Sequence, residues 1–168
     1  MRKDVKLYNV LFPIWMLCLF PITWLIVLPG NFIIDFTVVA LTMKFLKLPN
    51  IMKTTKAVIL RVWIMGFVAD FIGTAGMFLS NLLYEWISND FTYELMFAVN
   101  YNPFQNIWGF LWVTVCVVLT AILIYIFNYK WCLKKAEFDE VQCKKVALSL
   151  AIFTAPYLFY LPSMLFYQ

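Results

Sequence analysis

The sequence predicts an all-α, polytopic integral membrane protein with five transmembrane helices. Of its 168 residues, 64% are hydrophobic and 13% are charged, whereas soluble domains are about 45–50% apolar and about 25% charged. The apolar residues also form five stretches close to the roughly 20 residues that cross a bilayer as a helix. These observations exclude a soluble globular enzyme, a disordered chain and a disulfide scaffold.

The first two predicted spans cover residues 8–28 and 32–48. The first is too long for the apolar region of a cleaved signal peptide and lacks a small-residue cleavage site. Between the two spans, Pro29 and Gly30 are typical of a tight turn, because proline presets φ and glycine accepts φ > 0. We therefore expect these spans to form a helical hairpin.

The third predicted span, residues 57–83, follows a basic loop and is longer than a bilayer requires, so that it tilts or its ends emerge into water. Residues 84–106 mix acidic and aromatic side chains. Asn89 lies in a Ser-Asn-Asp sequence that could cap a short helix over residues 91–99. We expect this outer segment to lie on the membrane surface as an amphipathic helix.

The fourth predicted span covers residues 107–127 and the fifth covers residues 146–166. Between them, residues 128–145 carry many charges and form an aqueous inner loop. No repeat, flexible linker or change in composition marks a second domain, so residues 1–168 are expected to form one membrane domain.

The basic residues predict the orientation, because lysine and arginine accumulate in inner loops. With the N-terminus inside and the C-terminus outside, all 13 basic residues lie at the inner side. The outer loops then carry only Glu85, Asp90 and Glu94. We expect a multi-pass protein of a cell membrane, and the richness in Lys, Ile, Phe and Asn favours a bacterial cytoplasmic membrane.

Asp70 is the strongest candidate functional residue. It lies mid-span, about 15–20 Å from either end of its helix, and an aspartate there costs about 2.5–3.5 kcal/mol to insert. It must be protonated, bonded to polar groups of other helices, exposed to a water-filled cavity or bound to a cation. Either it couples to a proton or cation or anchors a ligand, or it is a neutral carboxyl that bridges helices.

Asp35 is the second membrane carboxylate. The predicted span boundaries place it four residues into its helix, about 6 Å deep, where a carboxylate is favoured by the helix dipole. It could act with Asp70, or it could simply reach interfacial water. The expected difference in depth between them is about 10 Å, which argues against an aspartyl enzyme, because such chemistry needs two carboxyls in contact.

Two further features of the third span have both a structural and a functional interpretation. Arg61 lies near the inner interface, where it can extend to lipid phosphates or bind an anionic headgroup. Small residues recur at helical spacing in a strip that would allow close helix packing, or docking of a partner subunit. The strip consists of Ala69, Gly73, Gly76 and Ser80.

Prolines interrupt the first and fifth predicted spans, at Pro13 and Pro21 and at Pro156 and Pro162. Each removes a helical hydrogen bond and tends to kink the axis. Kinked or broken membrane helices often shape a cavity or a hinge, although prolines are also common in ordinary transmembrane helices.

No catalytic motif is present, and the sequence contains no histidine. The four cysteines form no CxxC pair, so we expect no metal and no cofactor. Scattered loop lysines favour anionic lipid over nucleic acid.

Two classes of function remain. The first is a small non-catalytic membrane subunit, such as a scaffold, an assembly factor, an immunity-type protein or a membrane-embedded binding component. The second is a transporter or channel component that uses Asp70 and possibly Asp35. In either class we expect a membrane protein partner or a homo-oligomer.

Overall fold

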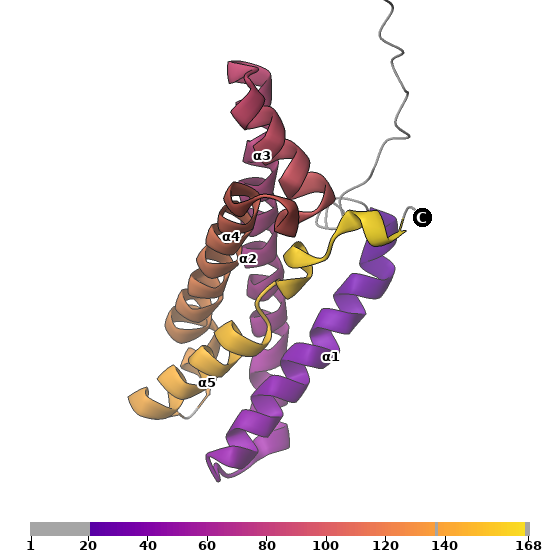
Figure 1. The fold of residues 1–168 in the computed structure, drawn as a ribbon. Coiled ribbons are helices and arrows are strands. Elements are labelled where there is room, and N and C mark those ends of the chain that lie inside the picture. The colour runs from indigo at the N-terminus through magenta and orange to yellow at the C-terminus, as the bar shows by residue number, and fades with distance from the viewer. Residues whose placement is uncertain (1–20, 137, 167–168) are drawn as a thin grey trace, which may run out of the picture.

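The computed structural model describes residues 21–136 and 138–166, and every regular element in them is helical (Figure 1). The longer helices are α1 (Pro21–Phe45), α2 (Ile51–Ile87), α3 (Asp90–Tyr101), α4 (Ile107–Phe127) and α5 (Glu140–Phe153). The short elements are η2 (Pro103–Gln105), η3 (Asn128–Cys132), η4 (Leu133–Lys135), η5 (Tyr157–Tyr160) and η6 (Ser163–Phe166).

Three segments of the described chain are long and apolar enough to cross a membrane: Trp24–Phe45, Ile51–Ile87 and Ile107–Lys135. They correspond to α1, α2 and α4 with its η3–η4 extension. At 1.5 Å per residue these three helices are about 38, 56 and 32 Å long. The observed bounds of α4 equal those of the fourth predicted span. The five spans and the N-in/C-out orientation are not confirmed.

The predicted turn between the first two spans is wrong, because α1 continues through Pro29 and Gly30 as one helix. Proline at position 29 removes only one hydrogen bond from the helix, whereas a turn would expose several polar backbone groups inside the bilayer. Packing also holds this region straight against α2: Trp63 Nε1 donates to the carbonyl of Leu28 at 2.9 Å, and Phe32 packs edge-on against Trp63.

Because α1 is continuous, the basic residues near the N-terminus no longer support the predicted orientation. Residues 8–20 of the first predicted span, with Pro13, lie outside the described residues. The placement of Arg2, Lys3 and Lys6 at the inner side depended on the hairpin, so it no longer follows. The loops that join α1 to α2 and α4 to α5 still lie at one end of the bundle, at the bottom of Figure 1. Nine lysines gather in or beside these loops: Lys44, Lys47, Lys53, Lys56, Lys130, Lys134, Lys135, Lys144 and Lys145.

The fifth predicted span is not a continuous helix. Helix α5 begins six residues earlier, at Glu140, inside the predicted aqueous loop, where Asp139 caps it by accepting a hydrogen bond from Gln142 N at 2.7 Å. It ends at Phe153 after 14 residues, which is about 21 Å and too short to span. Pro156 has no N–H to continue the helix to the carbonyl of Ile152. The Tyr157 hydroxyl donates to that carbonyl instead, at 2.6 Å.

The predicted outer helix forms, with Asn89 as its N-cap in a capping box with Thr92. It does not lie across the end of the bundle. Helix α3 runs antiparallel beside the last turns of α2 (Figure 1), because Tyr93 contacts Tyr84 and Asn100 donates to Asn81 at 2.7 Å. The α2–α3 pair therefore prolongs the bundle at the end opposite the lysine-rich loops.

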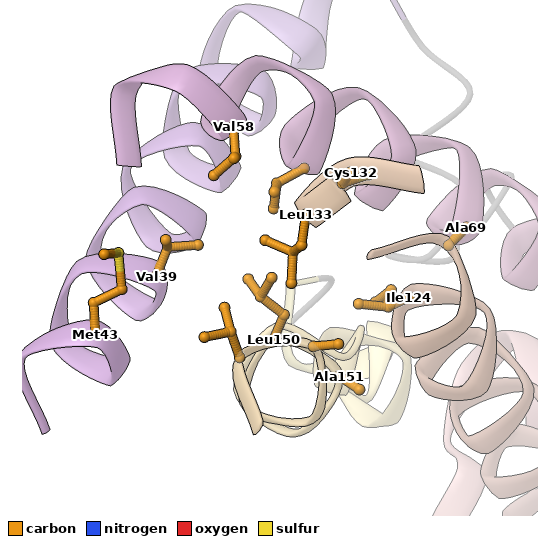
Figure 2. Packing of buried hydrophobic residues seen from close by; sticks show 12 residues of the cluster. Val39, Met43, Val58, Ala69, Ile124, Cys132, Leu133, Leu150 and Ala151 are labelled. Atoms are coloured by element: carbon orange, nitrogen blue, oxygen red, sulfur yellow. The ribbon is translucent and has the colours of Figure 1, made fainter. Parts of the chain in front are cut away.

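The largest apolar core lies near the lysine-rich end, where four helices converge (Figure 2). Val39 and Met43 from α1 and Val58 from α2 point toward Leu133 and Leu150. All five side chains are at most 1% exposed. This packing fixes the lower halves of α1, α2, α4 and α5, so that the helices diverge only farther along the bundle.

Candidate binding cavity with two buried aspartates

A cavity of about 610 Å³ lies where α1 and α2 diverge. Its walls are residues 27–35 of α1, residues 66–70 of α2, the broken segment 153–162 and Phe104. Figure 1 shows this C-terminal segment, in yellow, crossing from α5 toward the start of α1. The volume falls within the range of about 300–1,000 Å³ that is typical of ligand pockets.

Asp35 and Asp70 both line this cavity. Asp35 lies 14 residues after Pro21 and ten before Phe45, so it is at mid-helix and not about 6 Å from a helix end. The predicted difference in depth between the two carboxyls is therefore wrong. It arose from the predicted turn, which placed a helix start next to Asp35. The depth argument against aspartyl chemistry fails with it.

Asp35, Gly66 and Asp70 lie on the same part of the cavity wall. A Cβ atom built at Gly66 would lie 3.6 Å from Asp35 Oδ2, and Gly66 is one helical turn before Asp70. The Asp35 side chain therefore packs against the face of α2 that carries Gly66.

Within the part of the chain that the structure describes, neither carboxyl has a partner that would explain its burial. Asp35 is 5% exposed, and no described residue hydrogen-bonds to its side chain. Asp70 Oδ1 is buried without a hydrogen-bond partner. Among the described residues that line the cavity there is no lysine or arginine. A buried, ionised carboxylate without a partner is costly. The arrangement therefore favours either a protonated carboxyl or a cation bound beside it.

Seven serine and threonine hydroxyls might have bridged Asp70 to other helices. Two of them, Thr42 and Ser149, line a different cavity, and the other five bond within their own helices. Each of these five bonds to a carbonyl one turn earlier, which is the usual local arrangement for serine and threonine in helices. The donors are Thr37, Thr74, Thr114, Thr120 and Thr154. Asp70 therefore lies beside a cavity and not inside a cage of hydroxyls.

The small-residue strip on α2 faces α4 inside the bundle. A Cβ built at Gly73 would lie 2.1 Å from Thr120 Oγ1, and one at Gly76 would lie 3.1 Å from Cys116 Sγ. Ala69 and Ser80 are fully buried. The strip is therefore covered by the chain itself and presents no free docking face.

Arg61 does not line the cavity. Its side chain is exposed near the lysine-rich end, and its main-chain carbonyl accepts a hydrogen bond from Cys132 Sγ at 3.4 Å. Contact of the exposed guanidinium with an anionic headgroup stays a prediction.

Sequence reasoning missed most of the cavity wall, including Asn31, Phe67, Tyr157 and Tyr160. The signal that could have found it is the pair Pro156 and Pro162, which breaks the last apolar stretch and leaves irregular backbone where α5 would have continued. Irregular backbone at membrane depth is tolerated where protein buries it or where it lines a cavity.

Across the described residues, no group of three or more His, Cys, Asp and Glu side chains could hold a metal ion. Comparisons with protein-family models, with curated proteins and with solved structures found no match to this chain.

Proposed function

We propose that the protein is a small, non-catalytic binding component of a membrane transport system, in which Asp35 and Asp70 take up a proton or a cation. The observation that supports this most directly is that both buried aspartates line one cavity, where no described basic residue lies beside them and Asp70 Oδ1 has no hydrogen-bond partner among the described residues. Carboxylates in this setting are typical of proton and cation pathways through membranes.

The electrostatics of the pair favour uptake of a single positive charge. Two neighbouring carboxyls in apolar surroundings both resist ionising, so each holds a proton in the empty state and the pair is neutral. A cation that enters can replace a proton without leaving an uncompensated charge. The pair would thereby exchange one proton for one cation.

The small size of the chain favours work with a membrane protein partner or as a homo-oligomer. Three candidate spans are few for a transporter that acts alone, because such folds are usually built from repeated bundles. Native mass spectrometry from detergent would measure this, and a monomer without a co-purifying protein would count against a partner.

Modification by dicyclohexylcarbodiimide tests the proposed carboxyl chemistry, because this apolar reagent reacts with protonated carboxyl groups in apolar surroundings. We expect wild-type protein to form one adduct by intact mass spectrometry, faster at lower pH. The Asp35→Asn/Asp70→Asn double variant should form none. Asp90→Asn is the matched control, because Asp90 is exposed in the first turn of α3. An adduct that persists in the double variant would refute the proposal.

The convergence of the two carboxyls also favours one second candidate, an intramembrane aspartyl hydrolase. Such an enzyme needs both carboxyls, so either single Asn substitution would abolish cleavage of a transmembrane peptide. A binding pair would instead show no cleavage in the wild type.

A further inference from the structure

The wall of the cavity restricts the kind of cation that it can hold. Apart from the two carboxyls, its side chains are predominantly aliphatic and aromatic, with Phe67, Phe104 and Phe159 among them. Calcium and magnesium ions take six or more oxygen ligands, which the described residues of this cavity do not supply. A small hydrated ion would also have to shed its water shell against apolar side chains, which is costly.

The polar groups of the wall are mostly committed to the protein. The hydroxyls of Thr154, Tyr157 and Tyr160 donate to Leu150 O, Ile152 O and Thr114 Oγ1 at 2.6–3.0 Å. What remains for a ligand is two carboxyls that accept hydrogen bonds or positive charge and the side-chain amide of Asn31. An anion would meet these carboxyls without any positive charge nearby.

Aromatic rings add a second attraction for a positive charge. Tyr160 is held between Phe104 and Phe110, with ring centroids 6.3 and 5.7 Å apart, and Phe67 packs edge-on against Trp24. The faces of aromatic rings attract cations, more strongly when water is excluded, and the rings of Phe67, Phe104 and Tyr160 are part of the cavity wall.

From these features, we propose that the cavity binds an amphiphilic organic monocation, such as an alkylated amine or a quaternary ammonium ion with apolar substituents. The charged centre lies between Asp35 and Asp70, and the apolar substituents fill the space along residues 153–162. This inference rests on the proposed function and names the class of cation.

Proton competition follows from the same geometry. The titratable side chains among the described residues that line the cavity are Asp35, Asp70, Tyr157 and Tyr160, and the hydroxyls of both tyrosines donate hydrogen bonds to protein oxygens. Entry of one monocation therefore releases one proton from the carboxyl pair, and the affinity weakens as the pH falls.

Isothermal titration with two ions of the same shape and opposite charge tests this proposal in detergent micelles. We expect tetraphenylphosphonium to bind wild-type protein and tetraphenylborate not to bind. The dissociation constant for tetraphenylphosphonium should rise at least tenfold in Asp35→Asn and in Asp70→Asn, and should be unchanged in Asp90→Asn. Equal affinity of the double Asn variant and the wild type would overturn the proposal.

Two substitutions at Gly66 separate the effect of cavity volume from the effect of the carboxyl charges. Gly66→Ala adds only a methyl group in ordinary contact with Asp35 Oδ2, at 3.6 Å. Gly66→Leu extends into the cavity and should abolish phosphonium binding while the carbodiimide adduct persists. Unaltered phosphonium binding in a folded Gly66→Leu protein would contradict the proposed location.

The outcomes also separate this inference from the proposed function. If sodium ions bind in a way that depends on Asp35 and Asp70 but tetraphenylphosphonium does not bind, the proposal of an organic cation is wrong. The proposed function would still stand in that case. Absence of both a carbodiimide adduct and any cation binding would overturn the two together.

Discussion

The close packing of α2 against α4 at Gly73 leads to a specific prediction about the stability of the protein. A Cβ atom added there would lie 2.1 Å from Thr120 Oγ1, whereas ordinary contacts begin near 3.4 Å. Thr120 is fully buried, and its hydroxyl donates to Cys116 O at 2.9 Å. The threonine therefore cannot move away without losing its own hydrogen bond or separating the two helices.

The expected loss of unfolding free energy in Gly73→Ala can be compared with the effect of Gly30→Ala, the same substitution in another helix. Overpacking of a core costs about 1–3 kcal/mol, and an overlap this large places it near 3 kcal/mol. Alanine gains about 1 kcal/mol over glycine in a helix, which leaves a net loss of about 2 kcal/mol. Gly30→Ala meets nothing within 4 Å and should retain the whole gain of about 1 kcal/mol.

Thermal unfolding in detergent, followed by tryptophan fluorescence, measures both variants. At about 2–4 °C per kcal/mol for a chain of this length, we expect Tm to fall by about 4–8 °C in Gly73→Ala and to rise by about 2–4 °C in Gly30→Ala.

The double variant Gly73→Ala/Thr120→Ala tests whether the loss comes from this contact. It removes the overlapping oxygen and should recover most of the lost stability, as coupled neighbours do. A Gly73→Ala protein at least as stable as the wild type would refute the close approach of α2 to α4.

Three further predictions concern other contacts. Trp63→Phe loses the indole hydrogen bond to α1 and should cost about 1 kcal/mol, measured by thermal unfolding against Trp86→Phe, whose exposed side chain predicts a smaller change. Burial raises the pKa of the Cys143 thiol, so a protein with this single cysteine should react slowly with an impermeant maleimide near neutral pH and faster as the pH rises. In sealed vesicles, only the face that carries the lysine-rich loops should react. The ammonium of Lys144 lowers the pKa of Glu140 through a hydrogen bond, so the pair stabilises the fold above the ordinary glutamate pKa and loses this effect as the pH falls through the lowered value. Lys144→Gln should bring the carboxyl titration seen by NMR back toward the ordinary range, and an unchanged titration would contradict the ion pair.

Local signals in the sequence located several elements well. The bounds of α4 were predicted without error, because an apolar run flanked by asparagines has no competing alternative in a bilayer. Asn89 was predicted as a cap and is one, because capping depends on neighbours within one helical turn. The weakness of proline and glycine as breakers explains the error at Pro29 and Gly30, where contacts with Trp63 from another helix keep α1 continuous.

By itself, the sequence determined that the chain is helical, that it is apolar enough for a membrane, and that Asp70 needs an explanation. These conclusions rest on composition and on the cost of placing one charge in an apolar span, and both are local properties. Only the tertiary structure decided that Asp35 joins Asp70 in one cavity and that the small-residue strip is covered by α4. Both depend on which faces of α1, α2 and α4 meet, and a change in one helix boundary was enough to move Asp35 from a helix end to its middle.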